Sequence, residues 1–293
     1  MIMRILVSVM TYPSLSEKHF ETVCTAGFRE DGSWIRIFPI PYRMICKDNN
    51  KLRYHKWQWI EVDVEKRVQD NRPESYHIRN LDTLKIDPNI VGKGKEVDWN
   101  LRLRWVMKNK QIFKNMTELL DLTAQNTVSL AVIKPSLVKR VIPCDLRNKD
   151  DGKSMEKFAN KLSKLKARYE ADMLQMNFFE DKQDIKNAFQ FAEKIPYKFS
   201  YEFITEDGKT RTLMIEDWEI GALYRNCIQK YNNEEIAVQK VIEKYEKMMK
   251  QDIYLFLGTS YEWHKRKSSD PYIIIGVFAP PKNRVLDLEL FPI

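Results

Sequence analysis

Aromatic and basic side chains are interleaved near the N-terminus, a combination typical of proteins that bind single-stranded nucleic acid. The set consists of Trp34, Arg36, Arg43, Tyr54, Lys56, Trp57 and Trp59. Aromatic rings stack on bases, with a contribution of about 1–3 kcal/mol per base, while cations contact the phosphates. The alternative is that the tryptophans belong to the core, because an indole buries a large apolar area. The arginines are the better candidates, since the planar guanidinium fork matches a phosphate.

A second basic and aromatic set lies near the C-terminus, in a segment predicted as the loop 261–270. It consists of Tyr261, Trp263, His264, Lys265, Arg266 and Lys267. Such a loop can contact phosphates or the edge of a base. The alternative is a solvated loop that Trp263 anchors to the body of the protein. The two sets, together with Arg72, predict the nucleic-acid-binding residues Trp34, Arg36, Arg43, Lys56, Trp57, Arg72, Trp263, Lys265 and Arg266.

Two groups of carboxylates leave a metal-dependent nuclease or phosphodiesterase open as an alternative function. The first follows one strand face and comprises Glu61, Asp63, Glu65 and the neighbouring Lys66. The second is the polar cluster Asp70, Arg72, Glu74 and His77. Alternating acids on a strand also mark a solvent face, and a polar loop also makes local turn and capping bonds. Neither group singles out a catalytic residue, so the sequence does not decide whether the protein is an enzyme.

The sequence holds no arrangement of residues that predicts a metal site or a bound cofactor. Its cysteines form no C-x-x-C pair, and its four histidines are too few for zinc sites of the usual spacing. Cys24 has His19 near it in the sequence, but a nucleophilic thiolate also needs an electropositive pocket. The motifs of P-loop ATPases, dinucleotide-dependent oxidoreductases, zincins and α/β-hydrolases are absent. We therefore expect no cofactor and no metal.

An excess of basic residues favours a polyanionic partner. The chain of 293 residues has 49 Lys and Arg against 41 Asp and Glu, a net charge of +8, and a pI of about 9.1. Nucleic acid, nucleotides or an acidic protein would suit this charge. An adaptor subunit that binds an acidic protein is therefore a second alternative. The other interpretation is a lysine-rich surface that serves solubility.

The N-terminal run MIMRILVSVM predicts a buried strand and not a targeting or membrane segment. It has no small-residue cleavage site, and it is shorter than the ~20 apolar residues of a membrane helix. Scattered thiols without a disulfide framework indicate a reducing compartment. We predict a cytoplasmic protein with no membrane partner.

The elements that position the first aromatic and basic set form a β-rich domain, predicted over residues 1–150. Strands Glu21–Ala26 and Ser33–Ile40 flank the turn 29–32, and Trp57–Val68 forms a third strand. Short strands that precede any long helix are typical of a small barrel. We predict an OB- or PUA-like barrel with two short helices. The β-branched segments Val128–Ile133 and Leu137–Ile142 are expected to return to this sheet.

Alternation along Ser33–Ile40 predicts one core face and one binding face. Trp34, Arg36 and Phe38 point to one side of this strand. The apolar residues between them point to the other side and are expected to build the core. An indole, a guanidinium and a phenyl ring would then be available to a ligand.

The rest of the chain, 151–293, is predicted as a mixed domain of long basic helices packed on a small sheet. Ser154 precedes a helix with the outward side chains Lys157, Lys161, Lys164, Lys166 and Arg168, for which solvation is the alternative role. Asp207-Gly208 predicts a hairpin over 197–215. The remaining expected elements are helices over 184–195, from Glu216 or Asp217, and from Asn232 or Asn233, and strands near 253–257, 272–278 and 284–293.

These observations favour a non-catalytic α+β protein that binds nucleic acid. DNA or RNA would be the main partner, contacted at its phosphates by basic residues and at its bases by aromatic ones. A protein partner is also possible on grounds of charge. Such binding is expected to weaken steeply as the salt concentration rises.

Overall fold

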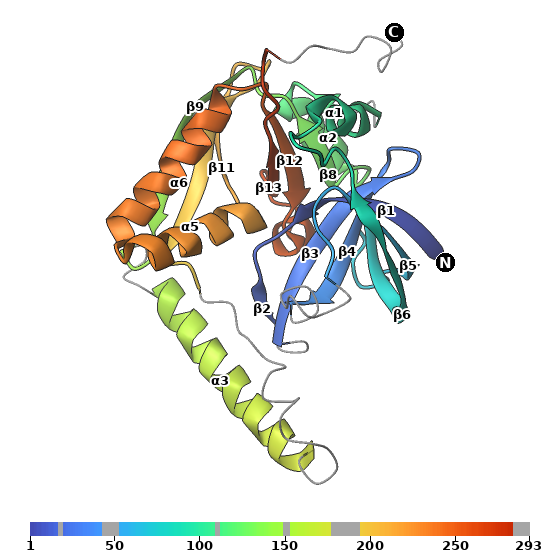
Figure 1. Cartoon of the computed structure of the whole chain (residues 1–293), viewed down its shortest axis with the longest axis vertical. Helices are drawn as coiled ribbons and strands as arrows, with labels where there is room; N and C mark the ends of the chain where they lie inside the picture. Colours follow the sequence, from blue (N-terminus) through green and yellow to red (C-terminus); the bar gives the residue numbers. More distant parts are fainter. Residues whose placement is uncertain (17–19, 43–52, 109–111, 149–152, 177–193, 284–293) are drawn as a thin grey trace.

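The predicted α+β class and the N-terminal barrel are confirmed by the computed structural model (Figure 1), which describes residues 1–16, 20–42, 53–108, 112–148, 153–176 and 194–283. This part of the chain contains a closed barrel, a sheet of three strands, a sheet of four strands and six helices. None of the described helices combines the length and the apolar character needed to cross a membrane.

The barrel is closed by five strands. They are β1 (Ile2–Met10), β3 (Phe20–Arg29), β4 (Trp34–Pro41), β5 (Gln58–Lys66) and β6 (Ser75–Ile90), with the short β2 (Ser14–Ser16) added beside β3. The order is β1-β5-β6-β4-β3, and pairing of β1 with β3 closes the ring. All these pairs are antiparallel except β4 with β6, where Arg36 lies opposite Ser75.

Most side chains on both faces of β4 are buried, which corrects the prediction of one free face on this strand. Alternate side chains such as Ile5, Ile35 and Ile37 fill the barrel interior. The opposite side chains, among them Trp34, pack against a second sheet instead of facing solvent. Because the prediction used only the alternation within one strand, it could not include a sheet that forms far along the chain.

The segments expected to rejoin the N-terminal sheet pair elsewhere, so that prediction is wrong. The first is β8 (Leu130–Ile133), which pairs with β12 (Tyr254–Thr259). The second is β9 (Leu137–Asp145), which pairs with β10 (Tyr197–Ile204). An alternating or apolar pattern reports which faces of a strand are buried, but the choice of partner depends on long-range packing.

Two sheets and a helix pair form the C-terminal half of the described fold. One sheet has the order β13 (Tyr272–Phe278), β12, β8 and β7 (Ile112–Phe113); the other has the order β11 (Thr210–Met214), β10 and β9. Helices α5 (Trp218–Tyr231) and α6 (Glu234–Met249) lie against the three-stranded sheet of β11, β10 and β9 (Figure 1). Tyr201 of β10 donates a hydrogen bond over 2.8 Å to the carbonyl of Tyr245 in α6.

The hairpin and both of these helices confirm the predicted elements. Gly208 adopts a φ of +72° in the turn, a conformation that favours glycine. Asp217 caps α5, and Asn233 caps α6 by accepting a hydrogen bond from the backbone N–H of Ile236 over 2.9 Å.

Four further helices complete the described structure. They are α1 (Trp99–Lys108), α2 (Met116–Ala124), α3 (Lys153–Met176) and α7 (Tyr261–Lys265). The segment after Tyr261 was expected to be a loop throughout, but its first residues form α7, whose turn is closed by the His264 N–H on the Ser260 carbonyl. In Figure 1, α3 extends away from the sheets.

Three of the predicted features remain predictions. The helix 184–195 lies almost wholly outside the described residues, as does the final strand 284–293. The division of the chain at residue 150 also stays a prediction. Strand β9 precedes that point and its partner β10 follows it.

Candidate functional site

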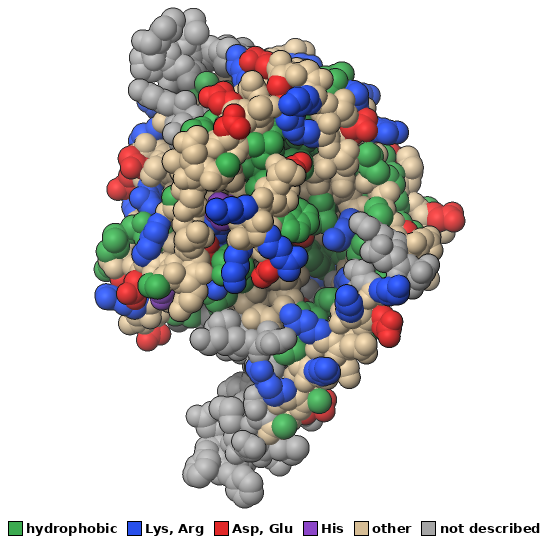
Figure 2. Space-filling model, turned by 180° about the vertical axis from the view of Figure 1, so that it is seen from behind, with side chains coloured by type: hydrophobic (Ala, Val, Ile, Leu, Met, Phe, Trp, Pro, Cys, Tyr) green, Lys and Arg blue, Asp and Glu red, His purple; other side chains and the backbone are tan. Residues whose placement is uncertain are grey.

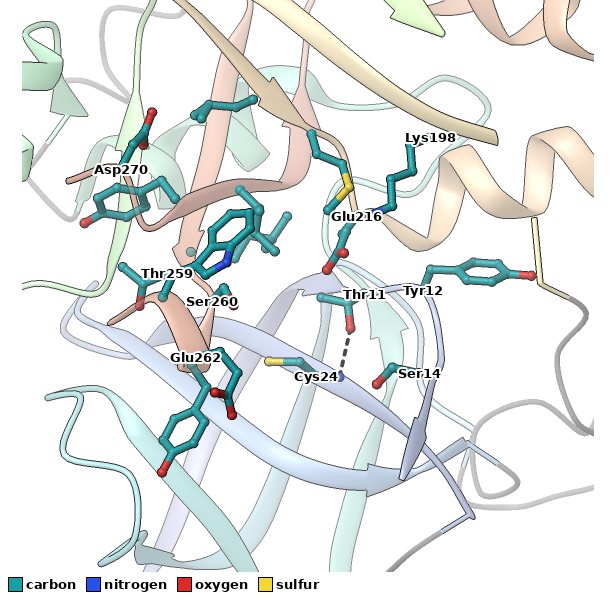
Figure 3. Close-up of a pocket in the computed structure, with 18 of the residues that line it drawn as sticks. Thr11, Tyr12, Ser14, Cys24, Lys198, Glu216, Thr259, Ser260, Glu262 and Asp270 are labelled. Carbon is teal, nitrogen blue, oxygen red and sulfur yellow. Dashed lines mark hydrogen bonds between the residues drawn. The ribbon is translucent and has the colours of Figure 1, made fainter. Parts of the chain in front are cut away.

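A cavity of about 780 Å³ lies between the barrel and the C-terminal sheets (Figure 3). The barrel side of its wall is formed by Thr11, Tyr12, Ser14, Cys24, Arg36, Phe38 and Arg72. The opposite side includes Lys198, Glu216, Thr259, Glu262, Trp263, Asp270 and Tyr272. We refer to this space as the central cavity.

Arg36 reaches the central cavity from β4 and is 3% exposed. Its Nη1 donates to Ser75 Oγ over 3.1 Å and to Ser129 Oγ over 2.9 Å, and its Nη2 donates to the Ser129 carbonyl over 3.1 Å. Burial, and then the nearby charge of Arg72, lower the pKa of the Arg36 guanidinium. The side chain thus ties the barrel to the strand β8 while one of its sides faces the cavity.

Arg72 reaches the same cavity from the β5–β6 connection and is 4% exposed. It forms a bidentate pair with Asp70, with Nε 2.8 Å from Oδ1 and Nη2 2.6 Å from Oδ2. Its guanidinium also lies 5.5 Å from the ring centre of Tyr261. Burial opposes ionisation of Asp70, but the hydrogen bonds and charge of Arg72 outweigh it and lower the pKa of Asp70 to about 2.

Glu74 completes a buried network of balanced charge. Its carboxylate accepts hydrogen bonds from the backbone N–H of Ser129 over 3.0 Å and from the Ser129 hydroxyl. Two arginines and two carboxylates therefore meet between the barrel and β8. The predicted polar cluster is in this respect structural, because Asp70 and Glu74 are both engaged by protein donors.

Cys24 lines the cavity as a neutral thiol. Burial raises its pKa despite the nearby positive charge of Arg36. Its backbone N–H donates to Thr11 Oγ1 over 2.9 Å (Figure 3). His19, the base that lies near it in the sequence, is outside the described residues. A raised pKa disfavours the thiolate, which is the nucleophilic form of cysteine.

Two carboxylic acids of raised pKa lie on different sides of the central cavity. Burial raises the pKa of Glu216, which lies beside Lys198, and it also raises the pKa of Asp270 (Figure 3). Asp270 Oδ1 is buried, and no group in the described part of the chain hydrogen-bonds it. The same is true of Thr259 Oγ1, in a residue that is 4% exposed.

The cavity wall carries equal numbers of cationic and acidic side chains, and two of the cations, Arg36 and Arg72, are also compensated by Asp70 and Glu74. Three cations line it, Arg36, Arg72 and Lys198, and so do three carboxylic acids, Glu216, Glu262 and Asp270. Apolar and aromatic side chains lie between them. A wall of this kind does not favour an anion over a neutral ligand, and it offers both donors and acceptors.

A second cavity, of about 510 Å³, lies next to α7. Its wall includes His264, Lys265 and Lys267, and Tyr261 lines both cavities. Exposed cations therefore flank the helix that carries Trp263. Figure 2 shows how Lys and Arg side chains are spread among apolar ones over one face of the molecule.

The nine predicted binding residues fall into distinct groups in the structure. Arg36, Arg72 and Trp263 line the central cavity, and Trp263 is 43% exposed. Lys265 belongs to α7, and Arg266 follows it with Nη2 3.7 Å from a Glu262 carboxylate oxygen. Arg43 lies outside the described residues.

Three predicted residues are engaged within the fold instead. The Trp34 ring lies 4.4 Å from that of Phe28, and the Trp57 ring lies 5.3 Å from that of Phe278, both measured between ring centres. Both indoles are buried. Lys56 Nζ lies 2.6 Å from an Asp217 oxygen and 2.7 Å from a Glu219 oxygen. All three side chains are thus engaged within the fold, the two indoles by ring packing and Lys56 by ion pairs.

The acids proposed for a nuclease have protein partners. The Asp63 carboxylate lies 2.8 Å from the N-terminal amine and 2.7 Å from Arg79, and these two donors lower its pKa. His77 Nε2 lies 3.9 Å from Glu65. Across the described ranges, no three His, Cys, Asp or Glu side chains are grouped as metal ligands.

Sequence reasoning missed Thr259, Glu216 and Asp270 as cavity residues. Glu216 was read only as a helix-start acid, which the local sequence supports equally well. Asp270 precedes Pro271 in a polar segment, and nothing in that segment indicates burial. Their common feature is the cavity, which exists only after the barrel and the C-terminal sheets have packed together.

Two family models match the chain, and neither carries a known function. The domain of unknown function DUF8758 matches residues 1–108. The domain of unknown function DUF8757 matches residues 112–291. No curated protein matches the sequence. Because its match spans more than half of the residues, the chain belongs to the family of the domain of unknown function DUF8757.

Proposed function

We propose that this protein binds nucleic acid and that the central cavity and helix α7 form its binding site. One observation carries the proposal, namely the position of the cavity on the barrel. In an OB-like barrel, oligonucleotides bind on the second and third strands and on the loops after the first and fourth strands. The barrel of this protein has the five strands and the closed order that make it OB-like.

The cavity wall follows that binding face element by element. Counted within the barrel, β3 and β4 are the second and third strands, and they supply Cys24, Arg36 and Phe38. The connection that leaves β1 supplies Thr11, and the connection between β5 and β6 supplies Arg72. The cavity thus occupies the place where barrels of this class take their ligand.

Exposed side chains on α7 and just after it offer contacts to bases and phosphates, which the buried arginines do not. Trp263 combines an exposed indole with a place on the cavity wall, so it can stack on a base. Lys265 and Lys267 line the neighbouring cavity, and the Arg266 side chain is 76% exposed. These cations can contact phosphates along a strand that crosses the helix. Trp34, Trp57 and Lys56 do not enter this proposal, because all three are engaged within the fold.

The test is binding of the purified chain to labelled single- and double-stranded DNA and RNA over a salt series, with and without magnesium. We expect binding without cleavage, and log affinity that falls linearly with log salt concentration. Trp263→Ala should weaken binding about 5- to 150-fold, the equivalent of one lost stack. The double variant Lys265→Ala/Arg266→Ala should reduce the salt slope by about 0.7 for each lost contact to a single strand.

Matched controls come from surfaces remote from α7. Tyr231→Ala removes another exposed aromatic side chain, and Lys247→Ala removes a cation from the exposed face of α6. Neither should change binding. Absence of binding to every polymer would overturn the proposal and favour the alternative of an adaptor subunit that binds an acidic protein. Cleavage that requires magnesium would instead favour the nuclease alternative.

A further inference from the structure

The central cavity presents two buried acceptors that the protein does not use. Thr259 is 4% exposed, and its Oγ1 has no hydrogen-bond partner among the described residues. Asp270 Oδ1 is likewise buried without a partner in that part of the chain, although the backbone N–H of Tyr272 hydrogen-bonds the same carboxyl group. Buried polar groups are usually hydrogen-bonded, so these two are available to a ligand, the Asp270 carboxyl oxygen as an acceptor and the Thr259 hydroxyl as an acceptor or a donor.

The size and lining of the cavity restrict what that ligand can be. A volume of about 780 Å³ lies in the range of small-molecule sites and is too small for a continuous strand. Phe38, Tyr272 and Ile275 supply apolar wall. The three acids on this wall, Glu216, Glu262 and Asp270, do not favour a lone phosphate. A flat, neutral heterocycle with hydrogen-bond donors at its edge fits the volume, the apolar wall and the charges of this cavity.

We propose that the central cavity takes a single nucleobase turned out of its stack, and that Asp270 and Thr259 select a base that carries an exocyclic amino group. This inference rests on the proposed function, since it names the unit of the polymer that enters the site. Carboxylates accept hydrogen bonds from such amino groups, as Asp and Glu do from cytosine. Adenine, cytosine and guanine therefore fit, whereas thymine and uracil lack the amino group.

The position of α7 explains how a base could enter while the strand stays outside. Trp263 lines the cavity and is also 43% exposed, so it spans from the wall to solvent. Tyr261 lies between the central cavity and the neighbouring basic one. Phosphates can remain beside Lys265 and Lys267 while one base passes inward. Enzymes and readers that extrude a base recognise it in the same way, by stacking and by hydrogen bonds to its edge.

The experiment compares a thymine-only oligonucleotide with the same strand carrying one central adenine, cytosine or guanine. We expect the amino-bearing base to raise affinity about tenfold over thymine, as one good base-edge contact does. Asp270→Ala removes the acceptor and should reduce that preference to less than about twofold, while it leaves binding to the thymine-only strand unchanged. Thr259→Val should reduce it in part.

A second readout reports extrusion directly. A duplex with one 2-aminopurine opposite a mismatch should brighten when the wild-type chain binds, because this base fluoresces more strongly once it leaves the stack. Asp82→Asn is the matched control: Asp82 is an exposed carboxylate of β6 that lines neither the central cavity nor the neighbouring one. It should leave both the preference and the brightening intact. Thermal unfolding of every variant checks that the fold is retained.

The outcomes separate this inference from the proposed function. Salt-sensitive binding of all strands with equal affinity and without brightening would overturn the selection of a base and leave the binding function in place. A base preference that survives Asp270→Ala and Thr259→Val would overturn the assignment of these residues. Failure to bind any strand would overturn both proposals together.

Discussion

Arg72 joins the barrel to a strand 187 residues further along the chain: its Nη1 donates a hydrogen bond over 2.5 Å to the carbonyl of Thr259. The same guanidinium is held in the bidentate pair with Asp70. Thr259 ends β12, immediately before Ser260 and α7. One buried side chain therefore positions both the β5–β6 connection and the segment that carries Trp263.

Arg72→Met should destabilise the fold by about 3–5 kcal/mol, because it leaves the buried Asp70 carboxylate without its cation. The free energy of unfolding in urea is the measurement. The double variant Asp70→Asn/Arg72→Met should cost much less than the sum of the two single variants, since no charge is then left unpaired. A loss below about 1 kcal/mol for Arg72→Met would contradict the role assigned to the pair.

Acid should weaken the fold through Asp70. Its pKa is lowered from 3.8 to about 2 in the folded state. A lowered carboxyl pKa contributes stability that is present above the unfolded pKa and is lost as the pH falls through the folded one. We expect a loss of about 2 kcal/mol between roughly pH 4 and pH 2 from this group. Urea unfolding at several pH values should show a shallower dependence for Asp70→Asn, and an equal dependence would exclude Asp70 as the cause.

Lys56→Met should destabilise the contact between the barrel and α5. Lys56 Nζ is shared by Asp217, which is fully buried, and by Glu219. Without it, the capping carboxylate loses its cation, at a cost of about 3–5 kcal/mol. Lys85→Met breaks an exposed pair with Glu61 and should cost no more than about 1 kcal/mol. Equal effects of the two variants in urea unfolding would contradict a buried role for Lys56.

Thr259→Val should leave stability unchanged or raise it by about 1 kcal/mol, although it removes a side-chain hydroxyl. The hydroxyl is buried without a partner among the described residues, and such a group costs free energy in the folded state. The melting temperature of the ligand-free protein is the measurement. Ser129→Ala is the contrast. It removes a hydroxyl that accepts a hydrogen bond from Arg36, so it should lower the melting temperature. A lower melting temperature for Thr259→Val would show that the hydroxyl has a partner in solution.

The candidate site could be predicted only in fragments. Arg36, Arg72 and Trp263 were identified by residue type, and all three line the central cavity. Trp34 and Trp57 were selected for the same reason and are buried elsewhere. Residue type indicates what a side chain can do, but burial decides whether it is available, and burial depends on elements that meet only in the folded chain.

Local sequence patterns account for the secondary structure of this protein. Alternation, capping residues and the Asp207-Gly208 turn act over a few residues, and the barrel strands, the hairpin and helices α5 and α6 follow from them. Long-range packing set the partners of β8 and β9, which pair with strands outside the barrel. It also decided that Arg72 meets Thr259. Strand pairing and cavity walls depend on contacts between distant segments, whose free energies no local pattern contains.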